Sequence, residues 1–276
     1  PDGRLLRQTI RDMLRMATCY RSTAYREGVD DNWAKPFFTG QPTHEPGTVF
    51  HYDTGCSQVL AALVKRLSGL EVMDFLEEKL FSPLGCQDER FWLRDPSGCC
   101  QGGTGLCMSL RDLHRVGECL LRGGEGLVPA WFVREMVRKQ IDTPQREADE
   151  EKHGYGWQCW QTRNGWSMYG LGGQLCVAVP EKKALLSTLA DTRLDPNGVQ
   201  KIYDAFFEEV EPYLGAEAME PEVWRLQVAP IPAGDPSFAR REEGPFRFEP
   251  ENQLALKTMA LRGETLHYEQ ERGPVM

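Results

Sequence analysis

Apolar residues recur at helical spacing along much of this chain, and particular polar residues mark where the helices should begin and end. Thr9 and Ser109 each stand three residues before an aspartate, a capping-box pattern that opens a helix. Gly69 and the Ser82-Pro83 pair are typical of positions where helices end. The expected helices span residues 9–16, 57–67, 72–80, 109–121, 129–139 and 199–210.

From residue 155 onward the spacing of apolar residues changes from helical to alternating. Tyr155–Thr162 and Trp166–Gly170 flank Asn164-Gly165, the strongest short hairpin signal in the chain. Further strands are expected at 175–179 and 184–190. The pattern predicts an α+β fold, an α/β-type sandwich in which an antiparallel sheet packs against helices. Loops are expected at 21–48, 86–108 and the acidic stretch 142–153.

After Gly215 the composition of the chain shifts. Residues 216–236 are proline-rich and indicate a linker. Residues 237–276 contain only a few weak strand patterns, such as Phe246-Arg247-Phe248, and are too few to bury a core of their own. We therefore expect one main domain at 1–215, a linker at 216–236 and part of a β-rich appendage at 237–276.

Composition and charge exclude several classes of partner. The 276 residues, of which 41% are hydrophobic, are typical of a soluble globular protein. A net charge of −9 argues against a nucleic-acid partner, and no apolar run approaches the roughly 20 residues that a membrane span needs. The chain begins at Pro1 without an initiator Met or a signal-peptide pattern, and we expect it to be a fragment of a longer product.

The cysteines indicate a compartment. There are nine, an odd number scattered through apolar segments, which argues against a disulfide framework and indicates a reducing cytoplasm. Cys99, Cys100 and Cys107 lie close together with His114 nearby, but no C-x-x-C pair completes a zinc pattern. Idle or buried thiols are the favoured interpretation, and we expect no metal or organic cofactor.

The most informative stretch runs from Pro46 to Gly85. It begins Pro-Gly-Thr-Val-Phe-His-Tyr-Asp-Thr, continues as an amphipathic segment and ends Phe-Ser-Pro-Leu-Gly. A tyrosine that ends an extended run directly before a helix can place its hydroxyl at the mouth of a pocket. Further informative segments are Asp12–Thr18, the Gly-Gly-x-Gly-Leu and Ser-x-x-Asp elements within 102–112, Tyr155-Gly156-Trp157, and Tyr169–Gln174 followed by Pro180.

In order and spacing, these segments resemble the serine β-lactamase-related hydrolases of the class C type, including penicillin-binding-protein-like and esterase-like branches, over residues 4–213. The resemblance implies a β-lactamase/transpeptidase-like fold and an acyl-enzyme mechanism, in which a serine within Ser-x-x-Lys attacks an ester or amide. It implies that Tyr52 relays the proton. Thr54 stands where the family has Asn, so one hydroxyl hydrogen bond would replace those of an amide. Without the resemblance, Tyr52 is an ordinary half-buried tyrosine.

The resemblance also places a third motif on the strand that ends at Gly170. Aligning Gly170 with the motif glycine puts Met168 where the family has Lys or His. Methionine carries no charge and donates no proton, so recognition of a substrate carboxylate should be weaker. The amide of Leu171 takes the place of one oxyanion donor, and it is equally suited to an ordinary strand hydrogen bond. The expected catalytic residue is Tyr52, and the expected substrate-binding residues are Thr54, Met168, Tyr169, Gly170 and Leu171.

The nucleophile of this mechanism is missing from the sequence, because no serine is followed three residues later by lysine. In the family that serine lies upstream of the matched segments, so we expect the N-terminal part of the domain to be absent from this chain. The first hypothesis is a serine hydrolase acting on a small acyl substrate, an ester or amide, and inactive as this polypeptide. The alternative is a pseudoenzyme that keeps the pocket to bind a ligand or a protein.

Other candidate groups carry weaker signals. Cys56 stands at a helix start, a position that can lower the pKa of a thiol and make it a nucleophile. His51 and His153 are candidate general bases, but lone histidines are more often polar surface residues. The acidic run Glu147–Glu151 is interpreted as a solvated loop. The Gly102-Gly103-x-Gly105 pattern is a poor match for dinucleotide binding, because it does not follow a strand and open a helix.

Overall fold

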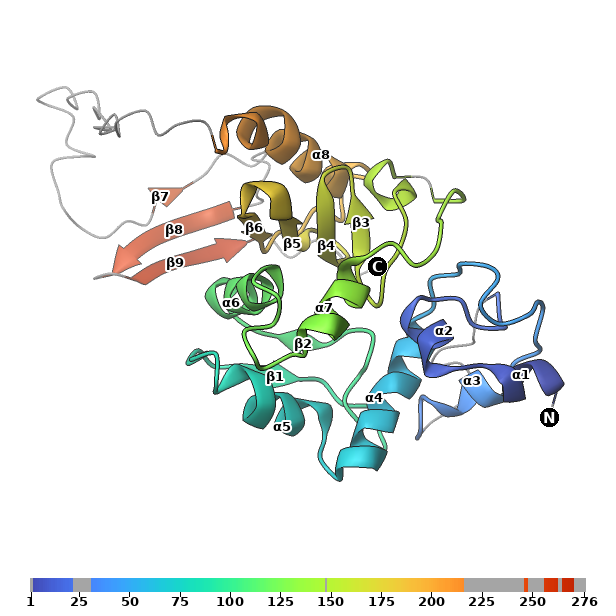
Figure 1. The fold of residues 1–276 in the computed structure, drawn as a ribbon. Coiled ribbons are helices and arrows are strands. Elements are labelled where there is room, and N and C mark those ends of the chain that lie inside the picture. Colours follow the sequence, from blue (N-terminus) through green and yellow to red (C-terminus); the bar gives the residue numbers. More distant parts are fainter. Residues whose placement is uncertain are drawn as a thin grey trace, which may run out of the picture. The chain divides into compact units, whose positions relative to one another are not determined.

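The structure is a computed structural model of the chain, drawn as a ribbon in Figure 1. It describes residues 2–21, 31–146 and 148–215, together with the backbone of three strands at 246–247, 256–262 and 265–270. The chain divides into two compact units, Pro1–Ala216 and Glu217–Met276. All the expected site residues belong to the first unit.

The helices of the first unit form mainly where the apolar spacing predicts them. They are α1 (Gly3–Arg7), α2 (Ile10–Leu14), α3 (Lys35–Thr39), α4 (Thr54–Ser68), α5 (Val72–Leu76), α6 (Leu110–Leu121), α7 (Ala130–Val137) and α8 (Gly198–Asp204). Helix α5 continues as a π-helical turn at Glu77–Phe81, and α8 as another at Ala205–Val210. The sequence did not predict α1 and α3, because a helix of five residues is too short to show a period.

An antiparallel sheet follows the helical half of the sequence. Its strands are β3 (Trp160–Thr162), β4 (Gly165–Gly170), β5 (Gln174–Val179) and β6 (Ala184–Thr188), neighbours in space as in sequence. Figure 1 shows α8 on one face of this sheet and α6 and α7 on the other. Leu175, Val177 and Val179 alternate onto the α8 side, where they pack with Tyr203 and Phe206. The expected α+β architecture is therefore confirmed.

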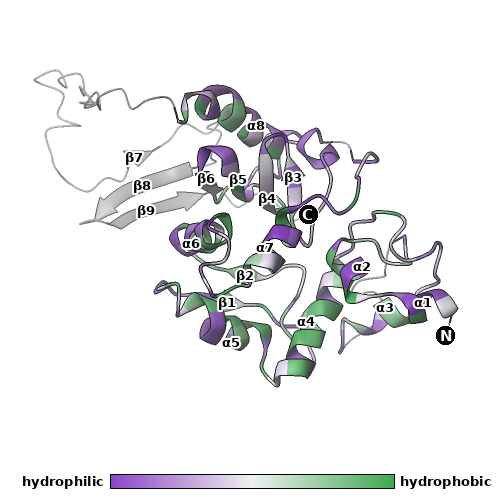
Figure 2. Cartoon of the chain, in the orientation of Figure 1, coloured by the Kyte–Doolittle hydropathy of each residue, from purple (hydrophilic) through white to green (hydrophobic). Residues whose placement is uncertain are grey.

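Helix α4 begins at Thr54, earlier than the predicted Ser57, because Asp53 caps it. The Asp53 carboxylate accepts a hydrogen bond from the Gly55 amide at 2.9 Å, which satisfies one of the free donors of the first turn. The helix ends as predicted at Gly69, whose φ of 76° is left-handed. Figure 2 shows hydrophobic and hydrophilic residues side by side along α4. The cap fixes the point at which the preceding extended segment joins the helix.

Strand β3 is shorter than predicted and lacks residues 155–159. The amide of Gly156 donates to the carbonyl of Cys159 at 2.7 Å and closes a tight turn. Gln158, within this turn, has a φ of 54° and donates its amide hydrogen to the Leu14 carbonyl at 2.7 Å. A contact with a distant helix thus replaces the first part of the strand, and apolar alternation alone does not indicate it.

The predicted hairpin between β3 and β4 is present, but its turn comes one residue earlier. Thr162 pairs with Gly165, so Arg163-Asn164 forms the turn. A Cβ atom at Gly165 would lie 2.0 Å from the carbonyl oxygen of Ala178 in β5. The glycine is therefore required by the close approach of two strands and not by the turn.

Two segments that were expected to be loops contain regular structure. Helix α3 lies within 21–48, of which residues 22–30 are outside the described part. In 86–108, β1 (Phe91–Trp92) pairs antiparallel with β2 (Leu106–Cys107). Such short elements leave no periodic pattern.

The predicted helix 129–139 ends early, at Val137, with Pro129 at its N-cap.

An ion cluster centred on the buried side chains of Asp112 and Arg90 joins α6 to the π-helical turn that follows α5. Ser109 caps α6 as predicted and accepts a hydrogen bond from the Asp112 amide at 3.2 Å. The Asp112 side chain, fully buried, pairs with Arg90 at 3.1 Å and with Arg115 at 3.2 Å. Arg90 also pairs with Glu77 at 2.8 Å. The predicted capping box is half formed, because the aspartate serves this tertiary ion cluster.

In the second unit, the described backbone forms an antiparallel sheet of three strands, β7 (Phe246–Arg247), β8 (Leu256–Arg262) and β9 (Thr265–Gln270). The strands lie within the segment that was expected to be β-rich. The linker expected at 216–236 lies outside the described residues, so it stays a prediction, as does the domain boundary at residue 215.

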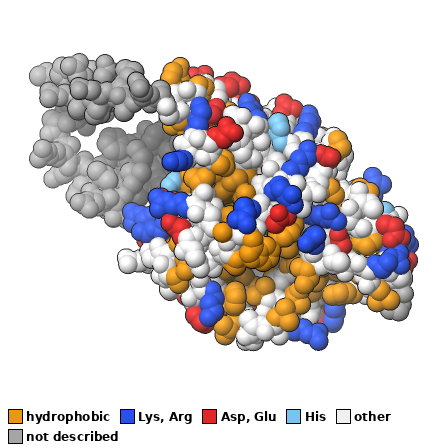
Figure 3. All heavy atoms as spheres, in the orientation of Figure 1, with side chains coloured by type: hydrophobic (Ala, Val, Ile, Leu, Met, Phe, Trp, Pro, Cys, Tyr) orange, Lys and Arg blue, Asp and Glu red, His pale blue; other side chains and the backbone are white. Residues whose placement is uncertain are grey.

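The surface of the first unit carries charges of both signs. Figure 3 shows Lys and Arg side chains interspersed with Asp and Glu on one face, and hydrophobic side chains gathered toward its middle. Mixed charge of this kind does not form the single-sign basic field that a phosphate backbone attracts. Among the helices that the structure describes, none combines the length and the apolar character of a membrane-spanning helix.

The Asp112 ion cluster should contribute to the stability of the fold. Asp112→Asn should lower the free energy of unfolding by about 3–5 kcal/mol, because it leaves the buried Arg90 guanidinium without one of its two carboxylate partners. Urea unfolding followed by circular dichroism measures this change. The control Glu78→Gln breaks the exposed pair with Lys79 and should leave the midpoint close to wild type. Equal midpoints for Asp112→Asn and wild type would contradict the stabilising role of the cluster.

Candidate functional site

A cavity of about 760 Å³ lies where the first turn of α4 meets the end of β4. Among the residues that line it are Tyr52, Thr54, Tyr169, Gly170 and Leu171. These belong to the two expected motifs, which lie far apart in the sequence. The fold therefore brings together five of the six residues that the sequence analysis assigned to the site.

Tyr52 reaches the cavity from the extended segment before α4. This segment is anchored on both sides, because the His51 amide donates to the Met16 carbonyl at 2.9 Å and the Gln145 side chain donates to the Phe50 carbonyl at 2.6 Å. The Tyr52 ring stacks on Trp160, with ring centroids 5.8 Å apart and 19° between the planes. It stays 43% exposed. The tyrosine therefore has a fixed wall on one side and an open cavity on the other.

The electrostatic surroundings of Tyr52 favour its protonated form. Loss of solvent raises the pKa of the Tyr52 hydroxyl above its ordinary value. The charge of Glu151 raises this pKa further, whereas the charge of Arg146 lowers it in part. The cations among the described lining residues are Arg146 and Arg193, and no lysine is among them. The hydroxyl is thus suited to donate a hydrogen bond, and it lacks the ammonium neighbour that would favour a tyrosinate.

Thr54 lines the cavity as the first residue of α4. The glycine-rich segment after β1 packs against this turn. A Cβ atom at Gly103 would lie 2.5 Å from the Thr54 methyl group, and one at Gly102 would lie 2.0 Å from the Ser57 carbonyl oxygen. Because these glycines have no side chain, the loop can lie directly on the helix. This packing accounts for the first two glycines of the Gly102-Gly103-x-Gly105 pattern, so a role in dinucleotide binding is not needed to explain them.

Met168 does not reach the cavity. Strand side chains alternate between faces, and Met168 packs on the side of α6 and α7, with Leu120 and Val133. Its neighbour Tyr169 faces the opposite way, lines the cavity and packs against Trp160 with ring centroids 6.2 Å apart. The alignment that put methionine in the third-motif position thus places an apolar core residue there.

Leu171 follows the last residue of β4 and is 77% exposed at the cavity. Beyond it the chain turns, and the Gly173 amide donates to the Gly170 carbonyl at 3.2 Å. Within the described residues, the Leu171 amide makes no backbone hydrogen bond across this turn. A donor that is free at the edge of a cavity can bind a carbonyl oxygen or an oxyanion.

Two residues of the acidic run Glu147–Glu151 are buried, which corrects the interpretation of this run as a solvated loop. Glu150 is 2% exposed and forms an ion pair with Arg163. Glu151 is 8% exposed and forms an ion pair with Arg146, and both of these residues line the cavity. Glu147 lies outside the described residues. Burial of these acids is possible because each has an arginine partner.

Several lining residues were not found by the sequence analysis. They are Trp92, Arg146, Glu151, Trp160, Gln174, Asp191 and Arg193. Gln174 ends the Tyr169–Gln174 segment noted in the sequence, although no role was assigned to it, and the others belong to no motif with a recognisable spacing.

The remaining candidates lie away from the cavity or are unreactive. Cys56 is fully buried, and burial raises the pKa of its thiol well above the ordinary value, which contradicts its interpretation as an activated nucleophile. Burial and the neighbouring His44 lower the pKa of His51. Neither His51 nor His153 lines the cavity. Burial also raises the pKa of Cys99, to about 11.

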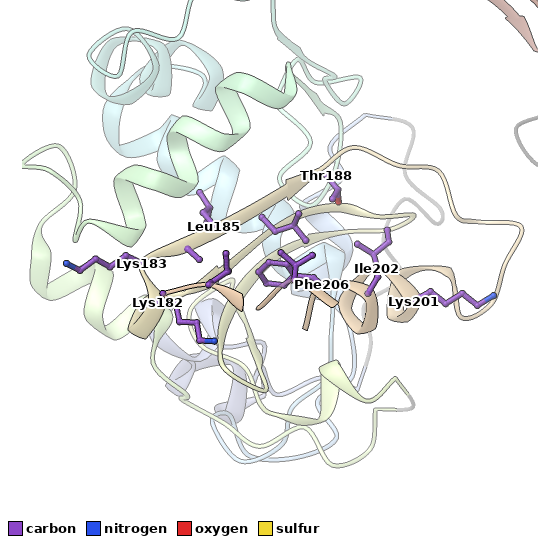
Figure 4. Close-up of a pocket in the computed structure, with 13 residues that line it drawn as sticks. Lys182, Lys183, Leu185, Thr188, Lys201, Ile202 and Phe206 are labelled. Carbon is purple, nitrogen blue, oxygen red and sulfur yellow. The ribbon is translucent and has the colours of Figure 1, made fainter. Parts of the chain in front are cut away.

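A second groove, of about 820 Å³, is formed by β6 on one side and by α8 and the π-helical turn after α8 on the other (Figure 4). Ile202 and Phe206 lie across from the strand, with Lys183 and Lys201 toward opposite ends. The groove is mainly apolar and contains none of the expected site residues. The smaller cavity is therefore the candidate functional site, since the motif residues and the polar groups gather there.

Comparisons with known proteins agree with this architecture. Residues 6–205 match the family described as “Beta-lactamase”. Comparison with curated proteins gives no match. Among solved structures, a protein from Bacillus anthracis described as a 6-aminohexanoate-dimer hydrolase is similar, with a TM-score of 0.59 and 19% identity over 72% of this chain and 60% of that one.

Two further structures have the same arrangement. One, from Bacteroides dorei, is described as a β-lactamase and has a TM-score of 0.55 and 17% identity, over 69% of this chain and 67% of its own. The other, a penicillin-binding protein from Bacillus halodurans, has a TM-score of 0.57 and 14% identity, over 75% of each chain.

These similarities establish a β-lactamase/transpeptidase-like fold, as the sequence resemblance implied. The chain spans 60% of the length of the Bacillus anthracis protein. The family match extends over residues 6–205, well over half of the 276 residues, and it includes the segments that form the cavity. This chain belongs to the β-lactamase family.

Proposed function

We propose that this chain is the body of a serine hydrolase that binds a small ester or amide in the cavity between α4 and β4. The observation that carries the proposal is the convergence of Tyr52 and Thr54 from one motif with Tyr169–Leu171 from another on a single cavity. The Bacillus anthracis neighbour, described as a 6-aminohexanoate-dimer hydrolase, supports chemistry on an amide or ester. The nine free cysteines support a reducing, cytoplasmic location.

Each group has a role that its surroundings permit. Tyr52 transfers a proton to or from the reacting groups, the Leu171 amide donates to the oxygen that becomes negatively charged, and Thr54 donates one hydroxyl hydrogen bond to the substrate. The attacking serine is not among residues 1–276 in the Ser-x-x-Lys form that this chemistry uses. Acyl transfer therefore needs a nucleophile beyond these residues.

A second candidate function is a pseudoenzyme that binds a ligand or a protein without acyl transfer. The position of Met168 favours it, because the residue that stands where the family has Lys or His packs away from the cavity, which therefore receives no cation from the third motif. The two functions share a cavity and differ in whether a serine becomes acylated.

Fluorophosphonate labelling separates them. The polypeptide of residues 1–276 should form no adduct, because none of its serines has the lysine partner that activates this nucleophile. A longer product of the same gene should be labelled on a Ser-x-x-Lys serine, and Tyr52→Phe should slow that labelling by about a hundredfold. Intact-mass spectrometry measures both reactions. Labelling of the 1–276 polypeptide would contradict the assigned mechanism, and an unlabelled longer product would favour the pseudoenzyme.

A titration tests the state of Tyr52. Its pKa is raised, so the hydroxyl should keep its proton at neutral pH and ionise above the ordinary tyrosine value of about 10. Arg146→Gln should raise this pKa further, since it removes the one neighbouring group that favours the tyrosinate. The difference in absorbance at 295 nm between wild type and Tyr52→Phe reports the ionisation. An ionisation below the ordinary value would indicate an activating cation instead.

A further inference from the structure

An ion pair forms part of the wall of the cavity. The Arg146 Nε donates to Glu151 Oε2 at 2.5 Å, and Nη2 pairs with the same carboxylate. The Arg146 side chain is 37% exposed, whereas that of Glu151 is 10% exposed. Both residues line the cavity, and the arginine is the more exposed of the two. Within the described residues, the Nη1 group of Arg146 has no hydrogen-bond partner, so donors remain for a ligand.

Independent contacts hold this pair in place. The Arg146 guanidinium lies 5.5 Å from the centre of the Trp160 ring, which is itself stacked on Tyr52. The Thr143 hydroxyl donates to the Glu151 backbone carbonyl at 2.6 Å. The Arg146 amide donates to the Thr143 carbonyl at 3.1 Å, which closes a turn that ends at Arg146. These contacts order both side chains before any ligand arrives.

The charges of the described lining residues cancel. The other charged residues are Asp191 and Arg193, which pair with each other at 2.6 Å and are more than half exposed. The cavity therefore offers hydrogen-bond donors and aromatic walls without a net charge. We propose that Arg146 and Glu151 determine specificity, so that the cavity selects an uncharged ester or amide whose oxygen accepts a hydrogen bond from Arg146. This inference rests on the proposed function and adds the class of substrate.

Electrostatics explains the selection. A ligand carboxylate beside Arg146 would also lie close to Glu151, and repulsion between like charges is stronger beside a largely buried carboxylate than in open water. A ligand ammonium would meet the guanidinium itself. A neutral carbonyl oxygen accepts from Arg146 and is not repelled by either group, while its apolar portion can contact Trp160 and Tyr169.

Matched probes test the inference by titration calorimetry on the chain of residues 1–276. The neutral probe is 4-phenylbutanamide and the anionic probe is 4-phenylbutanoate, which differ only in the terminal group. Wild type should bind the amide at least about tenfold more tightly than the carboxylate. Glu151→Gln should shift this ratio by about tenfold or more toward the carboxylate, because the guanidinium then has no anionic partner. Arg146→Gln should weaken binding of the amide and almost abolish that of the carboxylate.

Controls in the same segment separate a local effect from a change in net charge. Asp149→Asn and Lys152→Gln make the same changes in charge in an exposed ion pair that does not line the cavity. They should leave the ratio of the two affinities unchanged. Arg146→Lys keeps the cavity neutral and should keep the preference for the amide. Thermal unfolding of each variant identifies any that is not folded. If a charge-removing variant is not folded, the ratio of the two affinities is compared between wild type and Arg146→Lys alone.

The outcomes distinguish this inference from the function on which it rests. Failure of wild type to bind either probe would count against the proposed acyl-binding cavity itself. If wild type binds both probes equally, or if Glu151→Gln leaves the ratio of affinities unchanged, the cavity stands but the ion pair does not set its selectivity. A shift of the same size in Asp149→Asn would also overturn the inference, because it would show an effect of overall charge.

Discussion

The packing of aromatic rings around Trp160 is the interaction on which the candidate site depends. Trp160 is 4% exposed, and the rings of Phe50, Tyr52 and Tyr155 lie 5.6, 5.8 and 4.8 Å from it. Phe50 and Tyr52 precede helix α4, whereas Trp160 begins the sheet. Packing of these large rings therefore holds the segment that precedes α4 against the sheet beside the cavity.

The Trp160 ring also holds the charged group that influences Tyr52. Arg146 lies over Trp160, and its charge acts on the Tyr52 hydroxyl. Packing against Trp160 thus brings the ion pair to a place where it affects the pKa of Tyr52. Because Glu151 balances that charge, the cavity combines strong hydrogen-bond donors with a neutral interior. A neutral, aromatic-walled cavity is compatible with both proposed functions, which differ in whether a serine becomes acylated.

Close backbone approach is the second constraint on the site. Gly103 lies against Thr54, and Gly165 lies against Ala178 of the neighbouring strand, at distances that admit no side chain. At these two positions glycine is required by a contact between elements and not by a flexible or phosphate-binding loop. The first contact sets one wall of the cavity, and the second lets β4 run close to β5 toward Tyr169.

The sequence by itself determined the family resemblance, the main helices, the hairpin and the motif residues Tyr52, Thr54 and Tyr169–Leu171. These follow from local periodicity, capping residues and ordered motifs, which depend on neighbours along the chain. Only the tertiary structure decided that Met168 faces the core, that Cys56 is buried and that Arg146 and Glu151 line the cavity. The physical reason is that strand facing, burial and charge pairing depend on contacts between residues far apart in sequence, and spacing along one chain does not encode them.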